Sequence, residues 1–99
     1  MIKAVFSENG FEITGHALFA TSGKDIVCSA VSSLSQFVGN IIKNERLGEM
    51  KVGEAYLRVK IFQKNEFSLK LEKYLESALK GIEEDYPKHL CVEVKTNEN

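Results

Sequence analysis

The sequence predicts an α+β fold, a two-layer sandwich in which two helices cover one face of a four-stranded mixed sheet, in the order ββαβαβ. Four short segments alternate apolar and polar residues with the period of a β-strand. Two longer segments carry apolar residues at the three-and-four spacing of an amphipathic helix. Because 99 residues suffice for one modest core, we expect a single domain over residues 1–99.

The first two strands are predicted to form a hairpin. Residues 2–6 and 11–16 both alternate, and between them Asn9-Gly10 supplies the positive φ angles of a tight turn. We therefore expect the two strands to be antiparallel neighbours. His16 stands at the far end of the second strand, where the chain leaves the sheet.

A loop over residues 18–24 is predicted to lead into the first helix. An apolar stripe runs over residues 26–42, Asp25 is a good N-cap, and Lys43 suits the negative end of the helix dipole. Residues 48–53, which begin and end with glycine, are interpreted as a second loop, although Met50 and Val52 could begin the next strand early.

The second half of the chain predicts one further helix between two strands. Residues 55–62 alternate strictly and are the clearest strand in the chain. Asn65 then caps a helix whose inner stripe covers residues 67–82. Pro87 marks the exit from that helix, and residues 90–94 form the last strand.

Composition excludes or disfavours several function classes. Thirteen Lys and Arg against 14 Asp and Glu give a net charge of −1 without a basic stripe, which disfavours nucleic-acid binding. No apolar run is expected to span a membrane, and the N-terminus lacks the layout of a signal peptide, so we expect a cytoplasmic protein. The two cysteines should then be reduced. Without a CxxC pair they make a poor zinc site, and we expect no metal and no cofactor.

One of the two histidines and one of the two cysteines flank the predicted loop, which suggests a thiolate nucleophile with an imidazole partner. With Asp25 as N-cap, Cys28 falls in the first helical turn, where unpaired N–H groups and the helix dipole favour a larger thiolate fraction. The same N–H groups could hold an oxyanion, and His16 could act as base and then as acid.

Each of these residues also has a structural interpretation, which the spacing alone leaves open. Cys28 could be a small core residue and His16 an idle surface histidine. Asp25 could serve only as the N-cap, and Ser32, one turn beyond Cys28, could be a packing residue. Cys91, on the opposite pleat face from its apolar strand neighbours, is interpreted as structural. His89 is interpreted as a solvated residue at the entry to the last strand.

Two segments together resemble the signature of a known family, the bacterial ribosomal-processing cysteine proteases of the Prp type. A weaker resemblance continues through residues 82–87 and the last strand, so it covers essentially the whole chain. The segments that carry it are Gly15-His16-Ala17 and Gly23-Lys24-Asp25-Ile26-Val27-Cys28-Ser29-Ala30-Val31-Ser32.

The resemblance implies a cysteine protease that removes a short N-terminal extension from a large-subunit ribosomal protein, L-twenty-seven, before or during ribosome assembly. It implies Cys28 as nucleophile and His16 as its base, with Gly15, Asp25 and Ser32 as supporting residues. It also implies a homodimer. A loop that takes part in substrate binding would comprise Leu18, Phe19, Ala20, Thr21, Ser22, Gly23 and Lys24.

The chain departs from the family pattern at Ser29, where alanine is more usual, and at Leu18 and Phe19, which are more apolar than in many relatives. Two other classes of function remain as alternatives. One is a non-catalytic module that binds ribosomal proteins with the same fold. The other is a thiol redox protein, ranked lowest because Cys28 has no resolving cysteine nearby.

Overall fold

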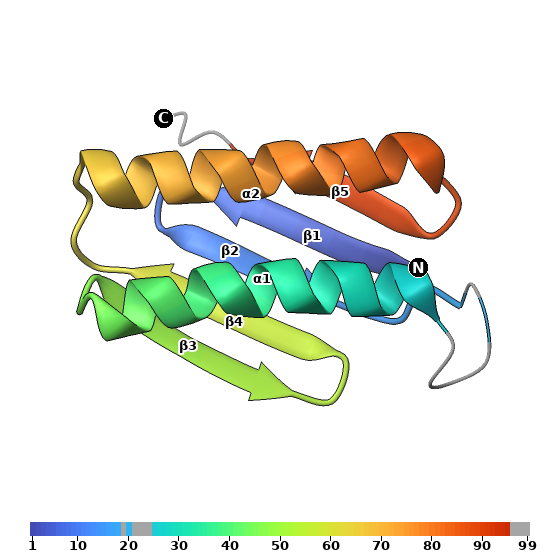
Figure 1. The fold of residues 1–99 in the computed structure, drawn as a ribbon, viewed down its shortest axis with the longest axis horizontal. Helices are drawn as coiled ribbons and strands as arrows, with labels where there is room; N and C mark the ends of the chain where they lie inside the picture. Colours follow the sequence, from blue (N-terminus) through green and yellow to red (C-terminus); the bar gives the residue numbers. More distant parts are fainter. Residues whose placement is uncertain (19, 21–24, 96–99) are drawn as a thin grey trace.

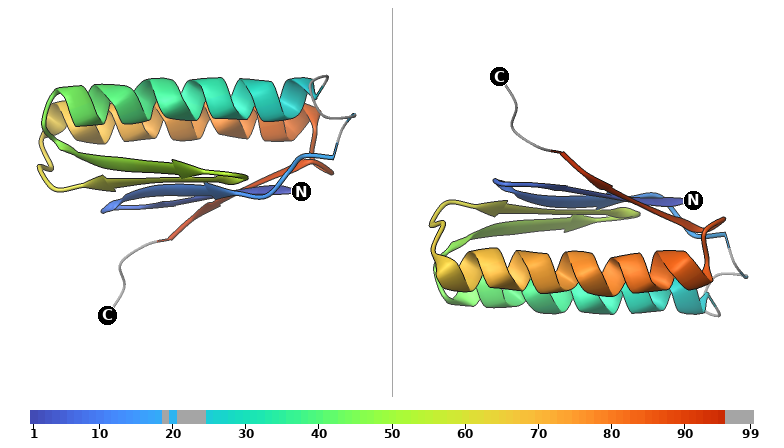
Figure 2. Two further views of the ribbon diagram at one scale, coloured as in Figure 1. Left: turned by 90° about the horizontal axis from the view of Figure 1, so that it is seen from below. Right: turned by 90° about the horizontal axis from the view of Figure 1, so that it is seen from above.

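In the described part of the chain, residues 1–18, 20 and 25–95, a five-stranded mixed sheet forms one layer and two helices cover one of its faces (Figure 1, Figure 2). This computed structural model confirms the predicted two-layer α+β architecture. The elements are β1 (Ile2–Ser7), β2 (Gly10–Thr14), α1 (Ile26–Asn44), β3 (Gly48–Gly53), β4 (Tyr56–Ile61), α2 (Glu66–Asp85) and β5 (Leu90–Val94). The strands lie in the order β3-β4-β2-β1-β5.

The prediction of four strands in the order ββαβαβ is wrong, because residues 48–53 form a strand rather than a loop. β3 pairs antiparallel with β4, with Met50 opposite Val59, and no other described strand pairs with it. Four of its six residues are exposed and glycines stand at both ends, so the strand signal is confined to the short alternation of residues 49–52. The observed order of the described elements is ββαββαβ.

β1 lies between β2 and β5 and pairs differently with each. The hairpin predicted at Asn9-Gly10 joins β1 to β2, and the two strands are antiparallel as expected. β5 is parallel to β1, with Leu90 opposite Ile2, and α2 belongs to the long crossover that precedes it. The starts of β1 and β5 therefore lie at the same end of the sheet as the end of β2 and the first turn of α1 (Figure 1).

The core lies between the sheet and the helices. Alternate strand residues face inward, and the rings of Phe6 and Phe11, which are opposite each other in the hairpin, have centroids 5.5 Å apart. The opposite face of the sheet carries polar residues, such as the ion pair between Lys3 and Glu93. Buried apolar side chains include Ile2, Ala4, Phe6, Phe11, Ile13, Leu57, Val59 and Ile61 from the strands and Val27, Val31, Val38, Ile42, Leu75 and Leu79 from the helices.

Both predicted helix caps are confirmed. The Asp25 side chain accepts a hydrogen bond of 3.0 Å from the backbone N–H of Cys28 at the start of α1. At the start of α2, Asn65 and Ser68 each accept a hydrogen bond from the other's backbone N–H, which makes a capping box. These side chains set the residue at which each helix begins, because they satisfy N–H groups that have no partner within the helix.

By length and composition alone, α1 could cross a membrane. This finding differs from the expectation that no segment of the chain has that length and composition. In the fold, one face of α1 packs against the sheet, and Val27, Val31 and Ile42 on that face are buried. A helix that lines a protein core meets the same criteria, and burial accounts for the apolar residues on this face, whereas Ile26 and Phe37 of α1 are exposed.

The chain leaves the sheet at Gly15, because β2 ends at Thr14, two residues before the end of the strand predicted over residues 11–16. Gly15 has a φ of +90°, and its N–H donates to the carbonyl of Ala55 at 3.0 Å. A Cβ at this position would collide with the carbonyl oxygen of Met1. The backbone of residue 15 thus passes too close to the start of β1 for any side chain.

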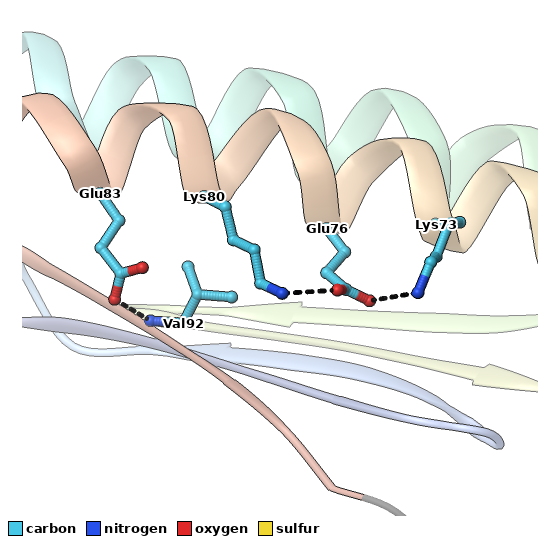
Figure 3. Close-up of polar contacts among 5 residues, drawn as sticks. All are labelled: Lys73, Glu76, Lys80, Glu83 and Val92. Carbon is cyan, nitrogen blue, oxygen red and sulfur yellow. Dashed lines mark hydrogen bonds and ion pairs between the residues drawn. The ribbon is translucent and has the colours of Figure 1, made fainter.

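The inner face of α2 carries carboxylates as well as apolar side chains. Glu83 accepts a 2.9 Å hydrogen bond from the backbone N–H of Val92 at the free edge of β5, and Glu76 lies between Lys73 and Lys80 (Figure 3). Glu72 is also buried, and its Oε2 has no hydrogen-bond partner among the described residues. Burial, reinforced by the charge of Glu76, raises the pKa of Glu72 to about 7.

We predict that Glu72→Gln removes a pH dependence of stability. Because the folded-state pKa of Glu72 is raised, the unfolded chain loses this proton first, and the free energy of unfolding falls as pH rises from about 4.5 to about 7. The glutamine variant should be more stable than the wild type above pH 7, by at most about 3 kcal/mol. Urea unfolding across this pH range measures the difference. Glu84→Gln, on the exposed side of the same helix, is the control and should keep the wild-type slope.

A second prediction concerns Gly15→Ala. The collision with the Met1 carbonyl and the positive φ should together lower the free energy of unfolding by about 2 kcal/mol or more. Thermal unfolding measures the loss. In Gly81→Ala, the matched control, the new Cβ meets no atom within 4 Å, and the helical position should gain up to about 1 kcal/mol. Equal stability of Gly15→Ala and the wild type would contradict the close approach.

Candidate active site

A cleft of about 190 Å³ opens at the end of the sheet where β2 ends and α1 begins. His16 and Cys28, the pair singled out in the sequence, both line this cleft, together with Gly15 and Ser32. The opposite wall comes from the β3–β4 hairpin, which adds residues such as Tyr56. The fold therefore brings the two predicted catalytic residues to one cavity.

Cys28 is half-buried in the first turn of α1, as predicted from the position of the N-cap. The backbone N–H of Ala17 donates a hydrogen bond to the Cys28 sulfur, with nitrogen and sulfur 3.2 Å apart. A donor directed at sulfur stabilises the thiolate more than the neutral thiol. The sulfur is thus held between the helix start and the segment that follows β2.

Asp25 is buried, at 9% exposure, and accepts two hydrogen bonds from the first turn of α1, one with its side chain and one with its backbone carbonyl. Its side chain accepts from the N–H of Cys28, and its carbonyl accepts from the N–H of Ser29 at 3.1 Å. The capping bond engages one of the unpaired first-turn N–H groups that the sequence suggested for an oxyanion, that of Cys28, whereas the bond from Ser29 is the first within the helix. The hydrogen bond that Ala17 donates to sulfur therefore marks a further backbone donor beside the cleft.

His16 is exposed and follows Gly15 directly at the mouth of the cleft. Among residues 1–18, 20 and 25–95, no hydrogen bond joins its ring to the Cys28 sulfur. Catalytic hydrogen bonds are often loose in the absence of substrate, and one cleft holds both groups. The shared cleft is compatible with proton exchange between imidazole and thiol.

Ser32 is exposed in the cleft, so its interpretation as a packing residue is wrong. Its hydroxyl accepts a 2.8 Å hydrogen bond from the side-chain amide of Gln36, one turn further along α1. Ser32 and Gln36 thus form a polar strip on the helix side of the cleft. Cys28, Ser32 and Gln36 follow one another at intervals of four residues, which places them on one helix face.

The interpretation of His89 as a solvated residue is also wrong. His89 is half-buried between α2 and β5, and its Nδ1 lies 2.8 Å from the carbonyl oxygen of Ala17. The two residues are 72 positions apart in sequence. They meet because the parallel pairing of β5 with β1 brings the start of β5 to the same end of the sheet as the end of β2.

Cys91 has no part in the cleft. It lies on the sheet face away from the helices, opposite Lys3 in the β1–β5 register, and is half-buried. This agrees with the prediction that it stands on the other pleat face from Leu90 and Val92. Both cysteines are free thiols, and the sheet separates Cys91 from Cys28. That separation weakens the redox alternative further, because Cys91 cannot act as a resolving cysteine in this fold.

Most of the predicted substrate-binding loop lies outside the described residues, namely Phe19, Thr21, Ser22, Gly23 and Lys24. Leu18 and Ala20 are described, and both are exposed. Leu18 has a φ of +57°, an uncommon conformation for a residue with a branched side chain. The backbone at Leu18 therefore adopts the left-handed conformation.

Sequence reasoning did not identify the far wall of the cleft or Ser35 at its base. Ser35 is fully buried, and in the described part of the chain its hydroxyl has no hydrogen-bond partner. Its spacing of seven residues from Cys28 could have placed it on the same helix face. The hairpin wall could not be found in this way, because β3 itself was not predicted. Within the described residues, no cluster of three or more His, Cys, Asp or Glu could hold a metal ion.

Comparisons with known proteins agree with these features. Two curated relatives named ribosomal processing cysteine protease Prp, from Mycoplasma genitalium and Mycoplasma pneumoniae, are 56% and 53% identical to the chain over 34 residues. The matched segment covers 34% of this chain and 34% of the length of each relative, so the match spans about a third of the curated relatives.

Solved structures share the fold over nearly the whole chain. The crystal structure of an essential ribosomal processing protease Prp from S. aureus, in complex with a covalently linked product peptide, has a TM-score of 0.84 at 19% identity. The structural match covers 96% of this chain and 100% of the S. aureus chain. A protein from Streptococcus mutans has a TM-score of 0.76 at 23% identity, with 98% and 96% covered.

The family model described as cysteine protease Prp matches residues 1–91, which include the cleft residues and every described helix and strand except the last positions of β5. The chain therefore belongs to the Prp family of cysteine proteases.

Proposed function

We propose that this chain is a cysteine endopeptidase that removes the N-terminal extension of a large-subunit ribosomal protein, L-twenty-seven, during ribosome assembly. The observation that carries the proposal is one cleft that holds a half-buried cysteine in the first turn of a helix together with a histidine. Membership of the Prp family and the names of the relatives support the ribosomal context. In this proposal residues 1–99 act as one protease domain in the cytoplasm.

The proposed reaction uses Cys28 as nucleophile and His16 as general base and acid. The imidazole accepts the thiol proton, the sulfur attacks the scissile carbonyl carbon, and the tetrahedral intermediate expels the amine, which takes the proton back from His16. Water, deprotonated by His16, then attacks the thioester and releases the new carboxylate and the thiol. The N–H of Ala17, already within hydrogen-bond distance of the sulfur, is a candidate donor to the developing oxyanion.

Three further residues support the site in this proposal. Gly15 permits the close passage beside Met1 that turns His16 toward the cleft, and Asp25 holds the backbone of Cys28. Ser32 offers a hydroxyl on the cleft wall. A terminal extension is a flexible peptide, and it would lie extended between this wall and the β3–β4 hairpin. In this proposal the loop over residues 18–24 takes part in substrate binding.

We predict that Cys28→Ala and Cys28→Ser abolish cleavage of a synthetic peptide that spans the extension of the ribosomal protein. His16→Ala should lower kcat/KM by about 10²- to 10⁴-fold, the usual contribution of a general base. Mass spectrometry of the products measures cleavage. Cys91→Ala, on the opposite face of the sheet, is the matched control and should cleave at the wild-type rate.

The same assay separates the protease from the binding-module alternative. A protease whose nucleophile is removed should still bind the extension peptide, which fluorescence anisotropy can show. Wild-type protein that binds the peptide but never cleaves it, with Cys28→Ala unchanged in affinity, would favour the non-catalytic module. Full cleavage by Cys28→Ala would contradict the assignment of the nucleophile.

We also propose that the protein is a homodimer, as the family resemblance implies. Large apolar side chains that a second copy could cover are exposed on the described surface, among them Phe37, Phe62 and Tyr74. Light scattering should give twice the mass of the 11.1 kDa chain. The mass of a single chain over the whole concentration range of the peptide assay would contradict this proposal.

A further inference from the structure

We propose that His89 is a positioning residue of the protease site, which holds Ala17 in place so that its N–H remains directed at the Cys28 sulfur. This inference rests on the proposed function. His89 lies outside the motif of residues 15–32 and near the other end of the chain, yet in this proposal it supports the backbone that contacts the nucleophile.

Two hydrogen bonds clamp Ala17 from opposite sides of its backbone. Its carbonyl oxygen lies 2.8 Å from Nδ1 of His89, and its nitrogen lies 3.2 Å from the Cys28 sulfur. A carbonyl oxygen can only accept, so Nδ1 of His89 carries the hydrogen in this contact. Ala17 is 1% exposed, and water has little access to replace either bond.

The backbone of His89 is itself held by the sheet and by the end of α2. Its carbonyl accepts from the N–H of Ile2 at 2.9 Å, and its N–H donates to the carbonyl of Tyr86 at 3.0 Å. The next residue, Leu90, is fully buried and pairs with Ile2 in the parallel register. His89 therefore offers Ala17 a donor attached to a rigid part of the fold.

Ala17 lies in a segment that has left the sheet. The strand pairing of β2 ends at Thr14, and Gly15 makes one further backbone bond to Ala55. Beyond that point, the hydrogen bond between the Ala17 carbonyl and His89 joins residues 16–18 to the residue before β5. Without this bond, the buried carbonyl of Ala17 has lost its hydrogen-bond donor and the backbone of residues 16–18 is less constrained. The N–H of Ala17 is then no longer held in the direction of the Cys28 sulfur.

The test compares three variants of His89 in a Cys91→Ala background, so that Cys28 is the only cysteine in the chain. His89→Leu keeps much of the volume and has no donor. His89→Asn places an amide nitrogen on the same branch as Nδ1 and keeps the donor. His89→Gln has the same polar group one carbon further out, where it no longer matches Nδ1.

The first readout is the rate at which iodoacetamide alkylates Cys28 at one fixed pH, because only the thiolate reacts. His89→Leu and His89→Gln should react about 5- to 30-fold more slowly than the wild type, the factor expected for one lost hydrogen bond. His89→Asn should react within about 2- to 3-fold of the wild type, on the same scale. The second readout is the exchange of the Ala17 amide hydrogen, which should be faster in the two slow variants.

These two readouts require no peptide cleavage, so they decide the role of His89 even when the extension peptide is not a substrate. Where cleavage occurs, kcat should fall with the alkylation rate while KM stays constant, because the substrate-binding walls are unchanged. Equal alkylation rates and equal Ala17 exchange in the asparagine and glutamine variants would overturn the proposal. The comparison of these two polar variants remains decisive if His89→Leu does not fold.

Discussion

The parallel pairing of β1 with β5 is the contact on which both the core and the candidate site depend. It requires a long crossover, to which α2 belongs, and it places Leu90 beside Ile2 although 88 positions separate them. Closing so large a loop is unfavourable in entropy, and the burial of Ile2, Leu90 and the inner face of α2 offsets this. The same register delivers His89 to the segment that carries His16, so one contact organises the core and the cleft together.

The candidate site combines a fixed nucleophile with a freer base. The sulfur of Cys28 is held through the capping bond to Asp25, the donor at Ala17 and the clamp of His89. His16, by contrast, is exposed and stands at the mouth of the cleft. This division suits an acyl-transfer reaction, because the imidazole must receive a proton from one group and deliver it to another.

α2 breaks the simple rule that the buried face of a helix is apolar. Glu76 satisfies its charge with Lys73 and Lys80, and Glu83 reaches the free edge of β5 to accept the N–H of Val92 (Figure 3). The second contact protects an edge strand against pairing with another chain. Glu72 has neither kind of partner among the described residues, and burial therefore raises its pKa toward neutrality.

Local sequence signals were sufficient wherever a structure depends on neighbouring residues. The hairpin at Asn9-Gly10, the caps at Asp25 and Asn65, and the alternation of β4 were all predictable, because turn chemistry, capping and periodicity act within a few residues. Cys28 could be placed in the first helical turn for the same reason.

Long-range pairing decided what remained. β3 is an edge strand in which only residues 49–52 alternate, between glycines at both ends, so its bonds to β4 decide that the whole of Gly48–Gly53 is a strand. His89 looked like an isolated surface residue, because its partner Ala17 is 72 positions away. The sequence by itself thus determined the helices, the hairpin and the His16–Cys28 motif. Only the tertiary structure decided β3, the far wall of the cleft and the contact of His89 with Ala17. The first two depend on the pairing of β3 with β4, and the third depends on the parallel register of β1 with β5.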